Sequence, residues 1–257
     1  MKFIIIFLIF VTLLFSASRH PGSFNSAKEY SERLILSEMD NYTIKTLYSQ
    51  IPLKYVYKTT FPKFPGKPKI DIILVPIEDR YSSSSYESRS HTIEWEHVVP
   101  AYWFRTADPF IKQSWDEGHP KCITSAGKVY KGRTCVKKVS PLFKQMEADM
   151  YNLEPALGSL NAIRSDSNFG LIDGEDRPYG ELIDFEIDRD RDVVEPTDTI
   201  RGKVARIMMY MNKKYGVQFP DHNNTLELMY QWNLQYQMTP WEMRKREILK
   251  ETYGYEF

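Results

Sequence analysis

The chain carries no excess charge of either sign, because 34 lysines and arginines balance 34 aspartates and glutamates over 257 residues. Attraction to a polyanion therefore cannot come from overall charge and requires local segregation of cations. Internal repeats are absent too, and no stretch is rich enough in glycine or proline to separate two domains. These absences favour a single domain.

Long apolar runs are scarce, and the clearest one opens the chain. After Met1 and Lys2, an uncharged apolar stretch extends from Phe3 to Phe15 and leads into small residues up to Ser18. A membrane span needs about 20 residues, whereas one positive charge, a short apolar run and small residues are typical of a secretory signal peptide. We expect residues 1–18 to be a cleaved signal and residues 19–257 to be one domain, without stable membrane association. A retained N-terminal anchor is the alternative.

Cysteine is almost absent, and the two that occur are Cys122 and Cys135. An even number of cysteines in an exported chain favours a disulfide. Zinc is the competing interpretation, but two cysteines 13 positions apart without a nearby histidine pair fit it poorly. The sequence also lacks His-Glu-x-x-His, which argues against a metalloprotease.

The cations are segregated into two runs that contain no acidic residue. Residues 121–144 hold seven basic residues and residues 199–220 hold five, whereas the acids gather between Asp173 and Glu195. A solvated surface is the usual meaning of one charge run. Two such runs together favour phosphate binding. Their members are Lys121, Lys128, Lys131, Arg133, Lys137, Lys138 and Lys144 in the first run, and Arg201, Lys203, Arg206, Lys213 and Lys214 in the second.

Hydrophobic spacing predicts both helices and strands. The predicted helices extend from Ser26 to about Gln50, from Pro141 to Met150, from Gly158 onward, from Thr199 to Tyr215 and within 224–252. The predicted strands cover residues 70–75 and 91–99, with a short extended piece at 152–157 and a polar loop around residues 79–85.

One motif combines carboxylates with an imidazole at the end of a predicted strand. It extends from Glu94 to Ala101 and includes Glu96 and His97 directly before Val98-Val99-Pro100. A carboxylate helps to hold a hard divalent cation, and a neutral histidine takes a proton from an attacking water. Glu94 and Glu96 lie on the same face of a strand, so the chemistry alone does not choose between them as a metal ligand.

Further motifs follow in a fixed order. They are Gly132-Arg133 with Cys135, Met146-Glu147-Ala148-Asp149-Met150 with Asn152-Leu153, Gly158 with Asn161 and Arg164, and Glu195-Pro196 with Arg201-Gly202. Together with the Glu96-His97 motif, they resemble the bacterial endonuclease I family over about residues 92–250. The resemblance implies an α+β fold: a mixed, mostly helical single domain around a ββα-metal (His-Me finger) motif.

The resemblance also implies roles for individual residues. It identifies His97 as the general base, Glu96 and Asn161 as ligands of Mg²⁺ (with Mn²⁺ or Ca²⁺ as substitutes), and Arg133 as the contact to the cleaved phosphate. Asn152 would brace the motif, and Glu147 and Arg164 would lie near it, with Glu147 holding either a metal-bound water or an arginine. From the first basic run we expect Lys131, Lys137 and Lys138 to contact substrate.

The implied function is that of a periplasmic or secreted, Mg²⁺-dependent, nonspecific endonuclease. It would act as a monomer on DNA, with RNA as a second substrate, and leave 5′-phosphate products. The main alternative is an exported nucleic-acid-binding protein of the same fold without turnover; a hydrolase of small phosphodiesters is a weaker one. The chain departs from the family pattern at Tyr151, where histidine is usual, and at Ala162-Ile163, where Gly-Asp is usual. These departures bear on substrate fit.

Overall fold

The computed structural model describes residues 20–60, 69–77, 86–174, 176–180 and 183–257. The predicted signal peptide 1–18 and the predicted polar loop 79–85 therefore lie outside the described residues. Described helices and small sheets share one continuous core, so the structure confirms a single α+β domain. None of the helices in the described ranges is long and apolar enough to cross a membrane.

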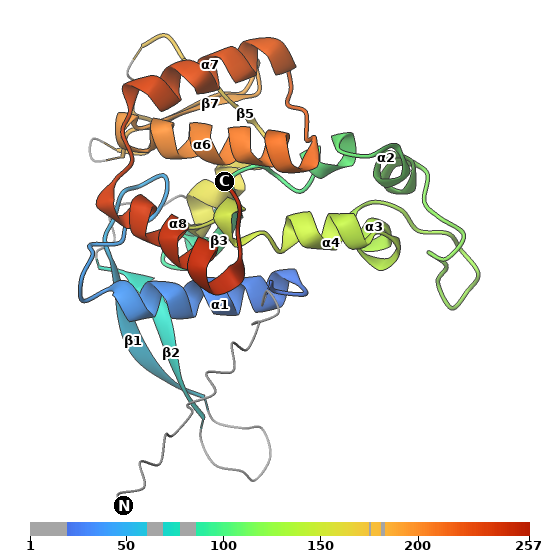
Figure 1. The fold of residues 1–257 in the computed structure, drawn as a ribbon, viewed down its shortest axis with the longest axis horizontal. Helices are drawn as coiled ribbons and strands as arrows, with labels where there is room; N and C mark the ends of the chain where they lie inside the picture. Colours follow the sequence, from blue (N-terminus) through green and yellow to red (C-terminus); the bar gives the residue numbers. More distant parts are fainter. Residues whose placement is uncertain (1–19, 61–68, 78–85, 175, 181–182) are drawn as a thin grey trace, which may run out of the picture.

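The strands form three small sheets in the described part of the chain. Strands β1 (Leu53–Thr60) and β2 (Lys69–Pro76) form an antiparallel hairpin that projects from the body (Figure 1). Strands β3 (Ile93–His97) and β4 (Leu153–Leu157) are also antiparallel. The third sheet has the order β5-β7-β6. Its strands are β5 (Asn168–Phe169), β6 (Phe185–Asp188) and β7 (Val193–Pro196).

Helix α1 (Phe24–Glu38) starts at a capping box in which the side chains of Ser23 and Ser26 bond each other's backbone N–H groups. Helix α1 ends at Glu38, so the predicted helix from Ser26 to Gln50 is too long at its C-terminal end. Asparagine and β-branched residues between positions 41 and 46 are poor helix formers. The chain there lies instead along β4, where the Leu47 N–H donates to the Pro155 carbonyl at 2.7 Å.

The middle of the chain is built from short helices. They are η1 (Glu87–Arg89), η2 (Trp103–Thr106), α2 (Pro109–Asp116), α3 (Arg133–Val139), α4 (Pro141–Glu147), η3 (Met150–Asn152) and α5 (Gly158–Arg164). The sequence predicted α4 and α5 but missed α2 and α3. Proline at the first position of α2 and of α4 has its fixed φ in helical range and lacks the N–H that would be unpaired there.

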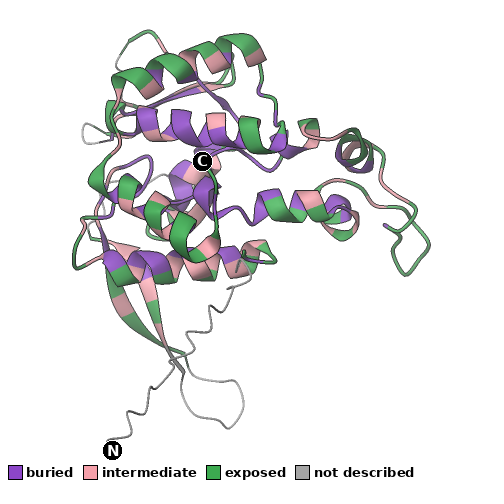
Figure 2. Cartoon of the chain, viewed as in Figure 1, coloured by how far each residue is buried: buried purple, intermediate pink, exposed green. Residues whose placement is uncertain are grey.

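Three long helices complete the chain: α6 (Asp198–Tyr215), α7 (His222–Gln235) and α8 (Pro240–Tyr253). The structure confirms the amphipathic helix predicted at 199–215. Helices α6 and α7 pack side by side (Figure 1), and α6 is mostly buried, whereas α7 has a broad exposed face (Figure 2). The helical segment predicted within 224–252 is divided between α7 and α8, because Pro240 suits the start of a helix and not its interior.

Candidate active site

Strands β3 and β4 and helix α5 form a β-β-α unit, as the sequence predicted. His97 ends β3 opposite Leu153 at the start of β4, and α5 follows β4 directly and packs on both strands. Asn152 joins the two strands, because its side-chain amide accepts from the Val99 N–H at 2.7 Å and donates to the Val99 carbonyl at 2.9 Å. These contacts suit the bracing role expected of Asn152.

His97 is held in one orientation by its Nε2 atom. That nitrogen lies 2.9 Å from the Glu147 carbonyl oxygen, which can only accept a hydrogen bond. In a neutral ring Nε2 therefore carries the proton and Nδ1 carries the lone pair. Burial and, to a smaller extent, the positive charges of Arg133 and Arg164 together lower the pKa of His97 to about 3, against the opposing effect of the Glu147 hydrogen bond. The imidazole is thus neutral at pH 7, the state that a general base requires.

Two aromatic rings pack against this imidazole. Phe24 lies 4.6 Å from the His97 ring centroid at an interplanar angle of 32°, and Phe104 contacts it edge-on at 5.9 Å. Phe24 belongs to α1 and also lies 5.6 Å from the Arg133 guanidinium. No motif in the sequence pointed to Phe24, which reaches the site only through the packing of α1.

Glu96 is 4% exposed, and one of its oxygens is fully engaged. Oε1 accepts from the Tyr48 hydroxyl at 2.6 Å and from Arg164 Nη1 at 3.0 Å. Burial raises the pKa of Glu96, while Arg164 and Tyr48 act in the opposite direction. Oε2 has no hydrogen bond to any described residue. The carboxylate is therefore fixed at one oxygen and leaves the other for a ligand.

Arg164 is fully buried and connects α5 to the end of β3. Besides Glu96, it donates to the carbonyls of His97 at 3.1 Å and of Val98 at 2.8 Å. Arg164 therefore helps to position Glu96 and His97. Removing its side chain would take this donor away from the Glu96 carboxylate and from the carbonyls of His97 and Val98, all of which are buried.

Glu94 differs from Glu96 in its contacts, although their chemistry alone did not choose between them and only the resemblance pointed to Glu96. Arg89 donates to both Glu94 oxygens, through Nε at 2.7 Å and Nη2 at 2.5 Å, and Asn161 Nδ2 donates to Oε2 at 2.9 Å. The Glu94 carboxylate also lies close to Gly158, because a Cβ added at Gly158 would be 2.6 Å from Oε1. Glu94 is thus committed to Arg89 and α5, while the Asn161 side-chain oxygen accepts from none of the described residues.

Arg133 is the first residue of α3. Its Nε donates to Glu147 Oε1 at 2.6 Å, and Lys137 lies 3.1 Å from Glu147 Oε2. The Glu147 side chain is 1% exposed and holds an arginine, one of the two roles left open by the sequence. The disulfide between Cys122 and Cys135 anchors α3 and confirms the predicted pairing.

These elements surround a cleft of about 610 Å³. Of the residues assigned from the sequence, His97, Glu96, Asn161 and Arg133 line it together, with Phe24 and Glu94 beside them. The three supporting residues Asn152, Glu147 and Arg164 lie behind this lining. Within the described ranges no cluster of three or more histidine, cysteine or acidic side chains forms a metal site, so a cation here would depend on one carboxylate and one amide.

The expected substrate lysines lie outside the lining of the cleft. Lys131 donates to the Asp116 carbonyl at 3.1 Å, Lys137 pairs with Glu147, and Lys138 lies over the Tyr130 ring at 5.9 Å. Lys138 is exposed and has no carboxylate partner among the described residues. It is therefore the best placed of the three to contact a phosphate beyond the cleft.

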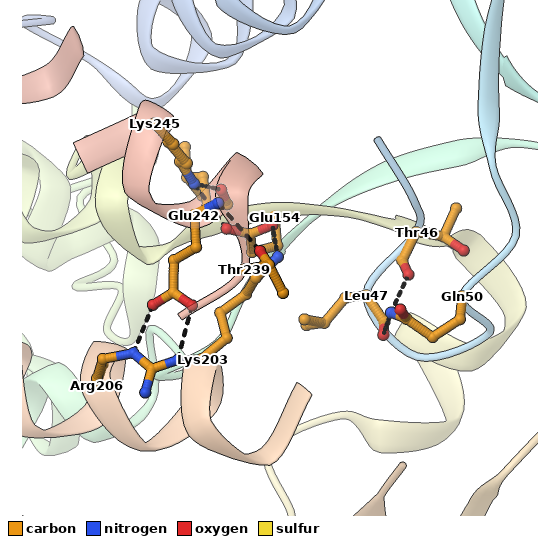
Figure 3. A network of polar contacts seen from close by, with 10 residues as sticks. Thr46, Leu47, Gln50, Glu154, Lys203, Arg206, Thr239, Glu242 and Lys245 are labelled. Carbon is orange, nitrogen blue, oxygen red and sulfur yellow. Dashed lines mark hydrogen bonds and ion pairs between the residues drawn. The ribbon is translucent and has the colours of Figure 1, made fainter. Parts of the chain in front are cut away.

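The second basic run does not form the phosphate-binding surface that its composition suggested. Figure 3 shows Arg206 facing Glu242, with Nε and Nη2 donating at 2.6 and 2.7 Å, and Lys203 beside Glu154. Carboxylates pair with most of this run, which the sequence did not show because all of these acids except Asp198 come from other elements of the fold. The pairs are Arg201 with Glu195 and Asp198, Lys203 with Glu154, Arg206 with Glu242, and Lys214 with Asp149.

The β-β-α unit, the buried imidazole and the adjoining carboxylate and amide oxygens fit the class of hydrolases. Comparison with known proteins agrees with that class. The sequence model of the family described as Endonuclease I matches residues 23–256. The chain therefore belongs to the Endonuclease I family, and it is a nuclease that hydrolyses phosphodiester bonds.

Individual relatives are similar over most of the chain. An extracellular deoxyribonuclease of Aeromonas hydrophila is 29% identical over 94% of this chain and 90% of its own length. A periplasmic deoxyribonuclease of the same species is 31% identical over 68% of this chain and 65% of its own length. Endonuclease-1 of Buchnera aphidicola is 30% identical over 68% of this chain, and the match spans 61% of that protein.

Proposed function

We propose that this protein is an exported, Mg²⁺-dependent, nonspecific endonuclease that hydrolyses DNA, and RNA as a second substrate, to 5′-phosphate products. The observation that carries the proposal is one cleft that contains a neutral imidazole with its lone pair at Nδ1, two oxygen ligands and an arginine. The names of the relatives, which are deoxyribonucleases from extracellular and periplasmic locations, support DNA as substrate and export.

The donor set fits magnesium. Glu96 Oε2 and the Asn161 side-chain oxygen have no hydrogen bonds to described residues and belong to residues that line the same cleft. Two hard oxygen ligands suit Mg²⁺, which keeps several of its waters. When bound, the cation would supply positive charge to the scissile phosphate and to the leaving oxygen.

His97 and Arg133 would perform the remaining chemistry. Nδ1 of His97 takes a proton from the attacking water, while the proton on Nε2 stays directed at the Glu147 carbonyl. The guanidinium nitrogens of Arg133 that do not contact Glu147 remain for the phosphate, which guanidinium binds in a bidentate way. Because these contacts reach the backbone and not the bases, sequence selectivity is weak.

The test is the reaction itself. Purified residues 19–257 are incubated with supercoiled plasmid and with RNA, each in Mg²⁺ and in EDTA. We expect nicking and linearisation of the plasmid with Mg²⁺ and none with EDTA. Cut plasmid should be resealed by DNA ligase without prior kinase treatment, because ligation needs a 5′-phosphate and a 3′-hydroxyl. Intact plasmid in both conditions would instead favour the binding protein without turnover.

A binding protein of the same fold is the second candidate, and it would also use Arg133. The tautomer of His97 argues against it, because a lone pair directed by a buried hydrogen bond serves proton transfer and contributes nothing to phosphate binding. We further propose that the protein acts as a monomer and, after signal removal, without membrane association.

A further inference from the structure

A second cavity lies away from the active-site cleft. Its volume is about 770 Å³, and residues of η3, α6, α7 and α8 line it, together with Met238 and residues 256–257. It shares no lining residue with the active-site cleft. A volume of this size is typical of small-molecule sites, which need about 300–1,000 Å³.

The side chains that line this cavity carry more positive than negative charge. Four cationic side chains line it against one acid, Glu256. Arg206 and Lys214 are neutralised by Glu242 and Asp149. The other two, Lys213 and Arg246, form no ion pair with any described residue, and Arg246 contacts only Met238 Sδ at 3.7 Å and nearby aromatic rings. Two cations without an ion pair exceed the single acid of the lining, and this excess favours an anionic ligand.

Aromatic side chains also line the cavity and could contact a ligand. Tyr151, Tyr210, Tyr230 and Phe257 all border the cavity. Tyr230 is 51% exposed, so one face of its ring is available for stacking. Phe257 packs against Tyr151 at 4.7 Å and against Tyr210 at 5.5 Å, which makes a continuous aromatic wall.

Tyr151 adds an independent sign of a missing partner. The residue is 2% exposed, and its hydroxyl has no hydrogen bond to any described residue. Burial raises the pKa of Tyr151, so the hydroxyl keeps its proton and remains a donor. Buried hydroxyls are rarely left without a partner, and a ligand acceptor or a water would satisfy this one.

We propose that this cavity binds a nucleotide, with the base on the aromatic wall and the phosphate at Lys213 and Arg246. An inorganic anion would leave the aromatic wall unused, and an apolar ligand would leave the two cations uncompensated. Base stacking on aromatic side chains contributes about 1–3 kcal/mol per base. The choice of a nucleotide over another aromatic anion rests on the proposed function, whose products are nucleotides and oligonucleotides with 5′-phosphates.

The test measures binding of deoxyadenosine monophosphate to the wild-type protein in EDTA by titration calorimetry. We expect saturable binding of this probe, and much weaker binding of deoxyadenosine and of inorganic phosphate. Lys213→Ala should weaken binding about tenfold, because it removes a charged hydrogen bond. Tyr230→Ala should weaken it about fivefold or more.

Matched controls separate this cavity from the rest of the molecule. Lys54→Ala and Tyr55→Ala replace exposed residues of β1 that do not line the cavity, and neither should change the affinity. Arg133→Ala, in the active-site cleft, should also leave it unchanged. No binding, or equal binding by Lys213→Ala and Tyr230→Ala, would overturn the proposal. Plasmid cleavage by the wild type in Mg²⁺ tests the proposed function separately, so the two failures are distinguishable.

Discussion

The Asn161 side-chain nitrogen donates to Glu94 Oε2 at 2.9 Å, and this contact fixes which end of the amide faces the cleft. Because Arg89 also holds Glu94, the carboxylate is a rigid acceptor. The amide oxygen of Asn161 is thereby left for a cation. Glu94 is a positioning residue in this arrangement, whereas Glu96 is the expected ligand.

The first prediction separates these two glutamates. Glu94→Ala should raise the Mg²⁺ concentration required for half-maximal cleavage, with kcat recovering at saturating metal, because only the orientation of Asn161 is lost. Glu94→Gln keeps an acceptor for Asn161 and should behave nearly like wild type. Glu96→Ala and Asn161→Ala should show a larger shift. The measurements are Mg²⁺ titrations of plasmid cleavage and of protein melting temperature. A larger effect at Glu94 than at Glu96 would reverse the assignment of the ligand.

The second prediction concerns the general base. His97→Ala should lower the cleavage rate about 100- to 10,000-fold, the usual contribution of a positioned base, and leave DNA affinity nearly unchanged. His119→Ala is the matched control, since His119 lies outside the cleft lining. The check is a single-turnover rate together with a binding isotherm. If His97→Ala retained more than about a tenth of the wild-type rate, another group would be the base.

The third prediction concerns the disulfide. Cys122→Ser with Cys135→Ser should cost about 3 kcal/mol of unfolding free energy for a loop of this length, and should raise KM more than it lowers kcat. Arg133 lies two positions from Cys135 at the start of α3, so a loosened α3 moves the phosphate contact. Denaturant unfolding and steady-state kinetics measure the two effects. Full activity in the double variant would show that α3 keeps Arg133 in place without the bridge.

The fourth prediction concerns the buried carboxylate of Glu154, which Lys203 contacts at 3.2 Å and Lys245 at 2.8 Å. These lysines outweigh burial and hold the pKa of Glu154 below its ordinary value of 4.5. Its contribution to stability is therefore present above that value and lost as pH falls through the lower, folded-state pKa. Glu154→Gln should destabilise the protein at pH 7 by about 3–5 kcal/mol, because two buried lysines lose their partner.

Urea unfolding at pH 7 and at pH 3 measures this effect. The difference between wild type and Glu154→Gln should shrink at the lower pH, because pH 3 lies below 4.5 and the unfolded chain, protonated at Glu154, must then lose that proton to fold with a charged carboxylate. Glu251→Gln is the matched control at an exposed site and should change little at either pH. A difference that stays constant between the two values would show that charge on Glu154 is not what stabilises the fold.

The sequence predicted the parts of the site that depend on local order. The pairing of β3 with β4, helix α5 and the cysteine pair all follow from short motifs and spacing. The surroundings of these parts come from residues that are distant in the chain. Tyr48 reaches Glu96 because α1 ends early, and Phe24 covers His97 because α1 packs across the site. No periodicity in the sequence encodes such contacts.

The basic runs show the same limit for charge. In the sequence, residues 199–220 contain five lysines and arginines and no acid, and composition therefore indicated a free cationic surface. In the fold, carboxylates from β4, β7 and α8 pair with them from across the core, as with Lys203 and Arg206. Only the tertiary structure shows whether a cation is paired with a carboxylate or free to bind phosphate. In contrast to Lys203 and Arg206, Lys138 of the first run is exposed.

The fifth prediction follows from that contrast. With inactive His97→Ala protein, DNA affinity should fall steeply with salt, at a slope of about −0.9 in log K against log salt for each phosphate contact. Lys138→Ala should reduce that slope by about one unit, with no change in sequence preference. Lys137→Ala should act mainly by loosening Glu147 and Arg133, and therefore lower affinity with a smaller change in slope.

Lys250→Ala controls for the loss of one exposed charge and should leave the slope unchanged, because Lys250 lies on α8, outside the cleft lining. The measurement is fluorescence anisotropy with two unrelated duplexes between 50 and 200 mM salt, roughly the range in which phosphate contacts dominate. Equal slopes for the two duplexes are expected, since the contacts reach the backbone. A slope near zero, or strong preference for one duplex, would contradict a backbone-reading nuclease and favour a small-substrate hydrolase or a specific binding protein.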